Sequence, residues 1–558
     1  MRTNTEADKS LPDGILPEED RIQAILARIE KLNKIGIALS AEKDTSRLLE
    51  SILIGAKELT NADAGTIYTR TEENTLRFEI IRTDSLKIAM GGTTGIKINF
   101  PELPLYKDGK PNMQMIAAYV ALEEKSINIP DAYEAHGFDF SGTKAFDKNT
   151  GYRSKSFLTV PLKNHENEVI GVLQLINAKD PVTSQIKEFS QEDQQLSESL
   201  ASQAAIAMTN QKLIADLNEL FESFIQAIAG AVDDKSAYTG GHCERVPVLA
   251  NLLAEAAKKS TIGDLKDFNP TEEDIHEIRI AAWLHDCGKV VTPEYVVDKS
   301  TKLETIYDRI HTVAARFEVL KRDFEIEFLN KKIALIEAGK QDEIPGLEAE
   351  LEEKTRQIDE DRLFIETSNV GGEFMSQERQ ARVKTIAGYQ WKAPGGNYEP
   401  LLSENEIYNL NIAKGTLNPE ERNIINHHVV ATKKMLSTIH FPKNLKNVAE
   451  MAGAHHETMN GTGYPDKLTR DQMSIPARIM AIADVFEALT AADRPYKEPK
   501  SLSDSLKILG FMKKDQHIDP DLFQVFIKEK VYLEYAQKHL KPGQIDEVIE
   551  AKIPGYEG

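Results

Sequence analysis

Strand-forming residues are concentrated in one stretch of this 558-residue chain. Between residues 50 and 180, short runs rich in β-branched and aromatic residues, such as TLRFEII and EVIGVLQLINA, are bounded by Gly, Asn, Asp or Lys. Such runs predict strands. From Asp233 to the C-terminus they nearly vanish. We therefore expect a multidomain α+β protein, with a mostly antiparallel sheet flanked by helices in its N-terminal domain and an all-α C-terminal domain.

Helical periodicity is found on both sides of the predicted sheet. From Arg21 to about Leu49, apolar residues recur at helical spacing, which predicts an N-terminal helix. After the sheet, Ser190 and Asp193 form a near capping box, and the helix that begins there is expected to run for about forty residues.

The second half of this long helix carries an apolar seam whose residues follow alternating steps of three and four, as in a two-stranded coiled coil. The seam consists of Leu213, Leu217, Leu220, Phe224, Ile228 and Ala231. One interpretation is a homodimer joined through this helix. The other is an amphipathic helix folded onto its own domain.

These patterns divide the chain into segments. Residues 304 to 370 are highly charged and are interrupted near GKQDEIPG, which predicts two long helices folded into a hairpin with a solvated charged face. We place this insertion at about 304–400. The predicted segments are a flexible tail over 1–20, the sheet domain over 21–210, the connecting helix over 211–230, the helical domain over 231–540 and a C-terminal tail over 541–558.

Charge and cysteine content exclude several classes of function. Lys and Arg total 68 against 89 Asp and Glu, and the net charge of −21 would repel a nucleic-acid backbone, so we expect no long nucleic acid as a partner. Cys243 and Cys287 form no CxxC pair, which argues against a disulfide framework or a thiolate zinc site. The first twenty residues do not resemble a signal peptide and the mean hydropathy is −0.40, so we expect a cytoplasmic protein without membrane segments.

Histidines and carboxylates cluster in five fragments of the helical half: GHCERV, LHDCGK, NHHVV, HHE and IADVFEAL. Imidazole and carboxylate ligands without cysteine suit Fe, Mn, Ni or Zn in an open catalytic site. His285 and Asp286 are adjacent, and neighbouring helical residues point about 100° apart, so the two would not readily chelate one ion. Two nearby ions would resolve this, with Asp286 bridging them. Lys289 is expected on the same helix face, where its ammonium can meet a phosphate oxygen.

The HD pair together with HHETMNGTGYP resembles the HD-GYP family, bacterial phosphodiesterases of cyclic di-GMP within the HD metal-dependent phosphohydrolase superfamily. The resemblance covers residues 225–315 and 400–530. It implies two or three divalent metal ions, Fe or Mn, and hydrolysis of cyclic di-GMP or a related cyclic dinucleotide to pGpG, GMP or both. The implied metal ligands are His242, His285, Asp286, His428, His455, His456 and Asp484.

The same resemblance implies catalytic and substrate-binding residues. Asp286 and Lys289 are the implied catalytic residues. Asp233 stands where members with a third metal commonly carry Glu, and Glu487 stands where they commonly carry Asp. Because the number of carboxylates is unchanged, we include both as predicted ligands of a third ion. The implied substrate contacts are Lys289, Gly461, Gly463, Tyr464, Arg494 and Lys497.

Residues 21–210 resemble a GAF domain through the segments INIPDAY, FDKNTGYRSKSFLTVPL and EVIGVLQLIN, which look like those of cyclic-nucleotide phosphodiesterases. Asn177, Phe189 and Asp193 match the pattern of GAF domains that bind a cyclic nucleotide. Ala178 and Gln194 stand where that pattern has Lys and Glu. A sensor of a cyclic nucleotide or another small ligand, and a purely dimerising module, are both compatible with these residues.

Three functions are compatible with these motifs. The first is a cyclic-dinucleotide phosphodiesterase regulated by its GAF domain. The second is a catalytically inactive protein that acts as a cyclic-dinucleotide receptor or a signalling scaffold. The third is an oxygenase, because HD-type di-iron sites resemble those of certain oxygenases. The full set of predicted ligands favours the first function over the second, and Lys289 and the GYP turn disfavour the third.

Overall fold

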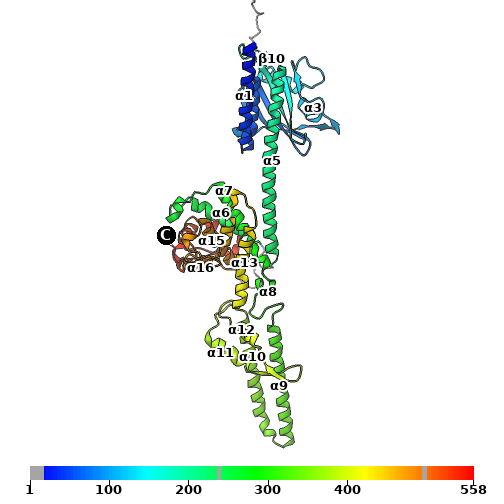
Figure 1. Ribbon diagram of the computed structural model, residues 1–558. Coiled ribbons are helices and arrows are strands. Elements are labelled where there is room, and N and C mark those ends of the chain that lie inside the picture. Colours follow the sequence, from blue (N-terminus) through cyan, green and yellow to red (C-terminus); the bar gives the residue numbers. More distant parts are fainter. Residues whose placement is uncertain (1–17, 236–240, 493–498, 558) are drawn as a thin grey trace, which may run out of the picture. The chain divides into compact units, whose positions relative to one another are not determined.

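The computed structural model describes residues 18–235, 241–492 and 499–557 (Figure 1). The chain divides into two compact units, Met1–Leu220 and Phe221–Gly558. As predicted, the first combines a sheet with helices and the second is mainly helical. No helix in the described part of the chain is both long enough and apolar enough to cross a lipid bilayer.

The first unit is built on an antiparallel sheet with the strand order β3-β2-β1-β9-β8-β7, in which β10 pairs with β9 and β4 pairs with β2. The four longest strands are β1, β2, β8 and β9, and the runs TLRFEII and EVIGVLQLINA coincide with β2 and β9. Two further short strands, β5 (Tyr106–Lys107) and β6 (Lys110–Pro111), form a separate hairpin. The strands of the main sheet are β1 (Ala62–Arg70), β2 (Thr75–Thr83), β3 (Ile88–Gly91), β4 (Leu103–Pro104), β7 (Ile127–Ile129), β8 (Phe157–Lys163), β9 (Val169–Lys179) and β10 (Ile186–Lys187).

Helices bury both faces of this sheet. Successive strand residues point to opposite faces, so Leu158 and Val160 join one apolar core and Phe157 joins the other. The first core includes side chains from α1 (Glu18–Ala41), α2 (Thr45–Thr60) and α5 (Gln191–Asp234). The second includes side chains from α3 (Ile116–Glu123) and the ring of Phe140, which precedes α4 (Ser141–Thr150).

The N-terminal helix predicted from Arg21 to about Leu49 is wrong in one respect, because the structure contains two helices there. Asp44 adopts an extended backbone conformation between α1 and α2, and its carboxylate accepts a hydrogen bond from the Arg47 N–H at 2.8 Å. An aspartate in this position caps the next helix and ends the preceding one. Apolar periodicity alone does not reveal such a break.

The capping box predicted at the start of α5 is confirmed. The Asp193 carboxylate accepts from the Ser190 N–H at 2.9 Å, and the Asp193 N–H donates to the Ser190 hydroxyl at 3.1 Å. The helix contains 44 residues. The larger side chains of its predicted seam are 43 to 64% exposed, so the chain itself leaves most of the seam uncovered; they are Leu213, Leu217, Leu220, Phe224 and Ile228.

The second unit has an apolar core made by helices from distant parts of the sequence. Between α7 and α13 the chain forms a short 3-10 helix, η3 (Cys287–Val291), and a single turn, α8 (Glu294–Val297). The principal helices are α6 (His242–Lys258), α7 (Glu272–Leu284), α13 (Pro419–Ser437), α14 (Val448–Gly453), α15 (Ile475–Thr490), α16 (Leu502–Lys514), α17 (Pro520–Lys528) and α18 (Val531–His539).

The predicted helical hairpin is present as α9 (Ile310–Glu337) and α10 (Ile344–Asn369), and Figure 1 shows the two helices side by side. This insertion has its own apolar core, to which α11 (Gln377–Ala387) and α12 (Glu404–Leu410) contribute. The helical half is not entirely α-helical. Strands β11 (Gln390–Lys392) and β12 (Tyr398–Pro400) form a small hairpin around a Pro-Gly-Gly-Asn segment, where the sequence predicted no strands. Three residues per strand are too few to give a detectable alternation.

Lys302, beside the insertion, is a buried lysine whose charge should reduce stability. Its side chain is 1% exposed, and its ammonium donates to the Leu410 carbonyl at 3.0 Å. Burial, together with the nearby Arg379, lowers the pKa of Lys302 from 10.5 to about 8. Between these values the unfolded chain holds a proton that the folded chain has released, so the free energy of unfolding rises with pH through this window. Lys302→Met should therefore stabilise the protein by roughly 1 to 2 kcal/mol at pH 7, and by less at pH 9.5, in urea unfolding.

Lys299 provides a matched control for this experiment. It is also buried, but its ammonium lies 2.7 and 2.8 Å from the two carboxylate oxygens of Glu421. Lys299→Met leaves that carboxylate without its cation and should destabilise the fold by about 3 kcal/mol or more. If Lys302→Met also destabilises the protein at pH 7, the stated consequence of the lowered pKa is wrong.

Candidate metal centre

The HD pair lies where one helix ends and another begins. Helix α7 ends at Leu284, His285 is its C-cap, and Asp286 precedes the first residue of η3. The two side chains therefore do not share one continuous helix, in contrast to the sequence prediction. The predicted neighbourhood of Lys289 and Asp286 is confirmed, because the tighter turn of η3 places the Lys289 ammonium 2.5 Å from Asp286 Oδ2.

Three histidine rings of the centre are oriented by main-chain carbonyls. In each, Nδ1 lies within hydrogen-bond distance of the carbonyl three residues earlier in the chain. An Nδ1–H that donates to a carbonyl leaves Nε2 unprotonated, with its lone pair free to bind a cation. The pairs are His285 with Ala282 at 2.7 Å, His428 with Ile425 at 2.5 Å and His455 with Ala452 at 2.6 Å.

The carboxylate of Asp286 lies between two groups of histidines. Its Oδ2 is 3.4 Å from His242 Nε2 and 3.3 Å from His285 Nε2. Its Oδ1 is 3.2 Å from His428 Nε2. The ligand atoms of His242, His285 and Asp286 all lie within 4.8 Å of one another. Each oxygen of Asp286 thus faces a different group of nitrogens, which is the arrangement of a bridging carboxylate.

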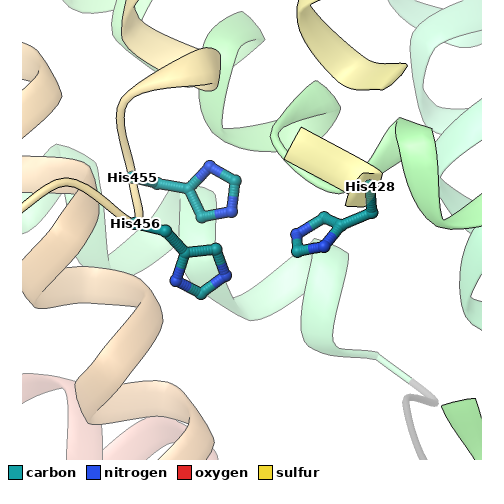
Figure 2. A group of neighbouring side chains, drawn as sticks. All are labelled: His428, His455 and His456. Carbon is teal, nitrogen blue, oxygen red and sulfur yellow. The ribbon is translucent and has the colours of Figure 1, made fainter. Parts of the chain in front are cut away.

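A second group is formed by His428, His455 and His456, whose ligand atoms also lie within 4.8 Å of one another. Figure 2 shows these three rings turned toward a common space, with His428 approaching from a different segment than the adjacent pair. Asp484 on α15 completes the surroundings, with Oδ1 3.4 Å from His242 Nε2 and 3.8 Å from His285 Nε2. The structure therefore brings together all seven residues that the HD-GYP resemblance implied as ligands.

The protonation states of His455, His456 and Asp286 suit divalent cations. Burial lowers the pKa of His456 to about 4 and, together with the adjacent His456 and His285, lowers the pKa of His455 well below its usual value. Burial opposes ionisation of Asp286, but Lys289 and His285 hold its pKa well below its usual value. At neutral pH these two imidazoles are neutral and the carboxylate is charged, as metal binding requires. His242 differs: burial opposes its protonation, but the carboxylates of Asp286, Asp484 and Glu487 raise its pKa well above the usual value.

Two nitrogen atoms test whether the residues fit a metal. Nε2 of His428 and Nε2 of His455 are buried and have no hydrogen-bond partner in the described part of the chain. A buried acceptor without a partner is unfavourable by about 1 to 3 kcal/mol. Two such atoms in one cluster, beside ionised carboxylates, fit divalent cations bound by nitrogen and oxygen.

Glu487 makes contacts that differ from its predicted role as a ligand of a third ion. Its Oε2 is bonded to His242 Nδ1, and its Oε1 accepts from Arg245 Nε at 2.6 Å. It therefore orients the His242 ring, and both of its oxygens are engaged by the protein. Asp233 lies nearby, where its Oδ2 accepts from the Cys243 N–H at 3.1 Å. Its role as a ligand stays a prediction.

Comparison with protein-family models gives three matches: a GAF domain at residues 44–208, an HD domain at 239–366 and an HD domain at 404–522. This chain joins a GAF domain to an HD domain. The two HD matches contain the ligand cluster, with His428, His455, His456 and Asp484 in the second of them.

Curated relatives match part of this GAF–HD chain. A 3'3'-cGAMP-specific phosphodiesterase of Vibrio cholerae is 36% identical over 20% of the chain and 24% of its own length. A probable cyclic di-GMP phosphodiesterase of the same organism is 35% identical over 23% of the chain and 30% of its own length. A cyclic di-GMP phosphodiesterase of Thermotoga maritima is 34% identical over 20% and 30%. The chain thus spans less than a third of the length of these relatives.

The loop of residues 460–468, which contains the GYP triplet and is called the GYP loop below, is held by Glu457, which sequence reasoning did not single out. The Glu457 side chain is buried, and it accepts hydrogen bonds from three successive main-chain N–H groups, those of Asp466, Lys467 and Leu468, at 2.7, 3.1 and 2.9 Å. The loop is therefore tied to the residue that follows the histidine pair. The signal in the sequence was the HHE triplet itself, in which Glu457 was taken as part of a metal-binding group.

Gly461 and Gly463 of this loop are suited to their positions for different structural reasons. Gly461 has a φ of +75°, which favours glycine. Gly463 does not, but a Cβ there would lie 2.5 Å from the Glu457 Cα. The close approach that Gly463 allows is therefore to the protein backbone. The ring of Tyr464 stacks on that of His456, with centroids 4.9 Å apart. Contacts of these residues with substrate stay predictions, and the predicted contacts Arg494 and Lys497 lie outside the described residues.

Glu457→Gln should weaken substrate binding without removing the metal ions. Glutamine retains one oxygen acceptor, so at least one of the three loop N–H groups loses its partner and the loop carrying Tyr464 loosens. We expect KM to rise by about tenfold, with the free energy of unfolding lowered by about 1 to 3 kcal/mol. Steady-state kinetics and elemental analysis measure both. Glu450→Gln, which alters an exposed carboxylate bonded to Ser474, is the control; an equal KM for both variants would contradict this role of Glu457.

The three predicted ligand residues of the GAF domain make contacts within its fold, and their role in ligand binding stays a prediction. Asn177 is fully buried and accepts from the Lys155 N–H at 2.7 Å and the Ser156 N–H at 3.3 Å. Phe189 belongs to the core between the sheet and the helices. Asp193 caps α5 and is bonded to Arg28 on α1. These contacts join segments distant in sequence, which a pattern of residue types does not distinguish from ligand contacts.

Proposed function

We propose that this chain is a metal-dependent phosphodiesterase that hydrolyses cyclic di-GMP or a related cyclic dinucleotide. The observation that carries the proposal is the Asp286 carboxylate, whose two oxygens face two separate groups of histidine Nε2 atoms. The activities for which the relatives are named support a cyclic dinucleotide as the substrate class. Because the matched segment is a minor part of each relative, the activity of the whole chain is our inference.

The donor set divides naturally into two ion sites that share Asp286. His242, His285 and Asp484 would hold one ion, since Asp484 Oδ1 lies 3.4 Å from His242 Nε2 and 3.8 Å from His285 Nε2. His428, His455 and His456 would hold the other. When bound, two divalent ions, Fe or Mn, supply an activated water and positive charge for the oxygens of the phosphodiester.

Lys289 contributes a positively charged side chain to the centre, in addition to the charge of the metal ions. Burial opposes its charge, but Asp286 and Asp484 raise the pKa of Lys289 above its usual value. The ammonium therefore stays protonated throughout the physiological range. It lies beside the bridging carboxylate, where it can donate to a non-bridging phosphate oxygen and stabilise the charge that grows there during attack on phosphorus.

The substrate side of the centre is proposed to be the GYP loop. Tyr464, stacked on His456, brings an aromatic ring next to the ligand cluster, where it can contact a guanine base. Gly461 and Gly463 shape the same loop, and Arg494 and Lys497 are proposed to contact the second half of the dinucleotide. Opening of one phosphodiester gives pGpG, and a second cut gives GMP.

Anaerobically purified protein loaded with Fe(II) or Mn(II) tests the proposal. It is incubated with cyclic di-GMP and, separately, with 3'3'-cyclic GMP-AMP, and products are separated by chromatography. We expect linear dinucleotide, mononucleotide or both. Binding without cleavage would replace the enzyme with a cyclic-dinucleotide receptor, and a product that forms only with dioxygen would indicate an oxygenase.

We also propose that α5 pairs with α5 of a second copy and that the GAF domain regulates the HD domain through this helix. The apolar seam is regular and largely exposed, which suits a self-complementary coiled coil. Light scattering should give the mass of a dimer for the full chain and of a monomer for Leu217→Lys. A monomeric full chain at micromolar concentration would refute the pairing.

A further inference from the structure

Thr432 lies on α13, one turn after His428, and is fully buried. Its hydroxyl accepts a hydrogen bond from the Gly288 N–H at 2.9 Å and donates one to the His285 carbonyl at 3.1 Å. Asp286 lies between these two residues in the chain. One side chain thus contacts the main chain on both sides of the central carboxylate.

We infer that Thr432 is a positioning residue that fixes Asp286 between the two histidine groups, an inference that rests on the proposed two-ion centre. The two main-chain groups that it binds belong to helix ends, where partners within the helix are lacking. The His285 carbonyl is at the C-cap of α7, and the Gly288 N–H is in the first turn of η3. Without the Thr432 hydroxyl, the His285 carbonyl and the Gly288 N–H each lose this hydrogen-bond partner. The turn that carries Asp286 then loses its hydrogen bonds to α13.

The attachment is close because Gly288 has no side chain. A Cβ at Gly288 would lie 2.0 Å from the His428 carbonyl oxygen and 2.5 Å from the Thr432 nitrogen. The backbone of η3 therefore lies directly against α13, the helix that carries His428. The hydrogen bonds of Thr432 and this close packing together fix the spacing between Asp286 and His428. Asp286 Oδ1 lies 3.2 Å from His428 Nε2.

The geometry gives Thr432 no direct part in the chemistry. Its hydroxyl bonds two main-chain groups and also lies beside the Cys287 thiol, so it acts through the turn that carries Asp286 rather than on substrate or metal. This distinguishes it from the ligands, and it predicts a specific pattern in which cation affinity changes while the affinity for the dinucleotide does not.

The full-length chain is compared with its Thr432→Val, Thr432→Ala and Thr432→Ser variants. Valine keeps the shape of threonine and removes its hydrogen bonds. Alanine also removes the hydrogen bonds but introduces no new methyl group, and it serves as the second variant if the valine protein does not fold. Mn(II) affinity and stoichiometry are measured by equilibrium dialysis. Valine and alanine should weaken Mn(II) binding by about 10- to 100-fold, and serine should restore it. At saturating Mn(II), KM for cyclic di-GMP should be unchanged.

Ser505→Ala is the matched control. Its hydroxyl is buried in the same domain but bonds only the Ser501 carbonyl of its own helix among the bonds described, so Mn(II) affinity should stay at the wild-type value. Unaltered Mn(II) affinity in the valine or alanine variant overturns the inference, as does failure of serine to restore it. If the wild-type chain binds Mn(II) but cleaves no cyclic dinucleotide, the proposed function fails, whereas the dialysis result still decides the role of Thr432.

Discussion

Asp286→Asn should reduce kcat/KM for cyclic di-GMP by at least about 10³-fold. Asparagine has the same size as aspartate but lacks the negative charge, and only one of its two terminal atoms can act as an acceptor. The oxygens of Asp286 face His242 and His285 on one side and His428 on the other. Two divalent ions held at this spacing repel each other, and the variant removes the charge that offsets the repulsion. Elemental analysis should show fewer than two ions per chain.

Asp361→Asn controls for loss of a buried carboxylate. Asp361 is 3% exposed and accepts hydrogen bonds from Arg382 and Tyr389 within the insertion. Its replacement should lower the free energy of unfolding but leave metal content and turnover at wild-type values. Retention of two ions and of turnover by Asp286→Asn would show that Asp286 does not bridge the ions.

Gly288→Ala should destabilise the HD domain by about 3 kcal/mol and release its metal ions. The new Cβ would lie 2.0 Å from the His428 carbonyl oxygen, and neither that oxygen nor the Thr432 nitrogen can move away as a flexible side chain would. Helix α13 and η3 must therefore separate, which moves His428 away from Asp286. Thermal unfolding and Mn(II) dialysis measure the two consequences.

Gly346→Ala is the control variant for Gly288→Ala. Gly346 lies in α10, and a Cβ there would meet nothing within 4 Å. Because alanine favours helix more than glycine does, the control should be stabilised by up to about 1 kcal/mol. If both variants unfold at the same temperature, the tight contact between η3 and α13 is contradicted.

The parts of the fold that sequence predicted correctly are those with local signals. The long strands β1, β2, β8 and β9 carry runs of β-branched residues, and the start of α5 is set by two residues three positions apart. The break at Asp44 was missed because one capping side chain outweighed a continuing apolar pattern. The hairpin of β11 and β12 was missed because its strands are three residues long.

The ligand cluster was predicted because its residue types and order follow a family pattern, but the supporting contacts were not. Glu457 binds three loop N–H groups 9 to 11 residues away, and Thr432 binds groups 144 and 147 residues away. Glu487 meets His242 across 245 residues. Such contacts depend on how distant helices pack, and no local pattern of residue types encodes the partner.

The carbonyl that orients His285, His428 or His455 belongs to the residue three positions earlier in each case. The carbonyl that orients each imidazole is therefore supplied by the local backbone, within four residues of chain. Because it spans only four residues, such a unit can be built into an unrelated helical scaffold, as it occurs here both at the end of α7 and inside α13. Designers of artificial di-metal proteins can place these units first and adjust only the spacing between helices.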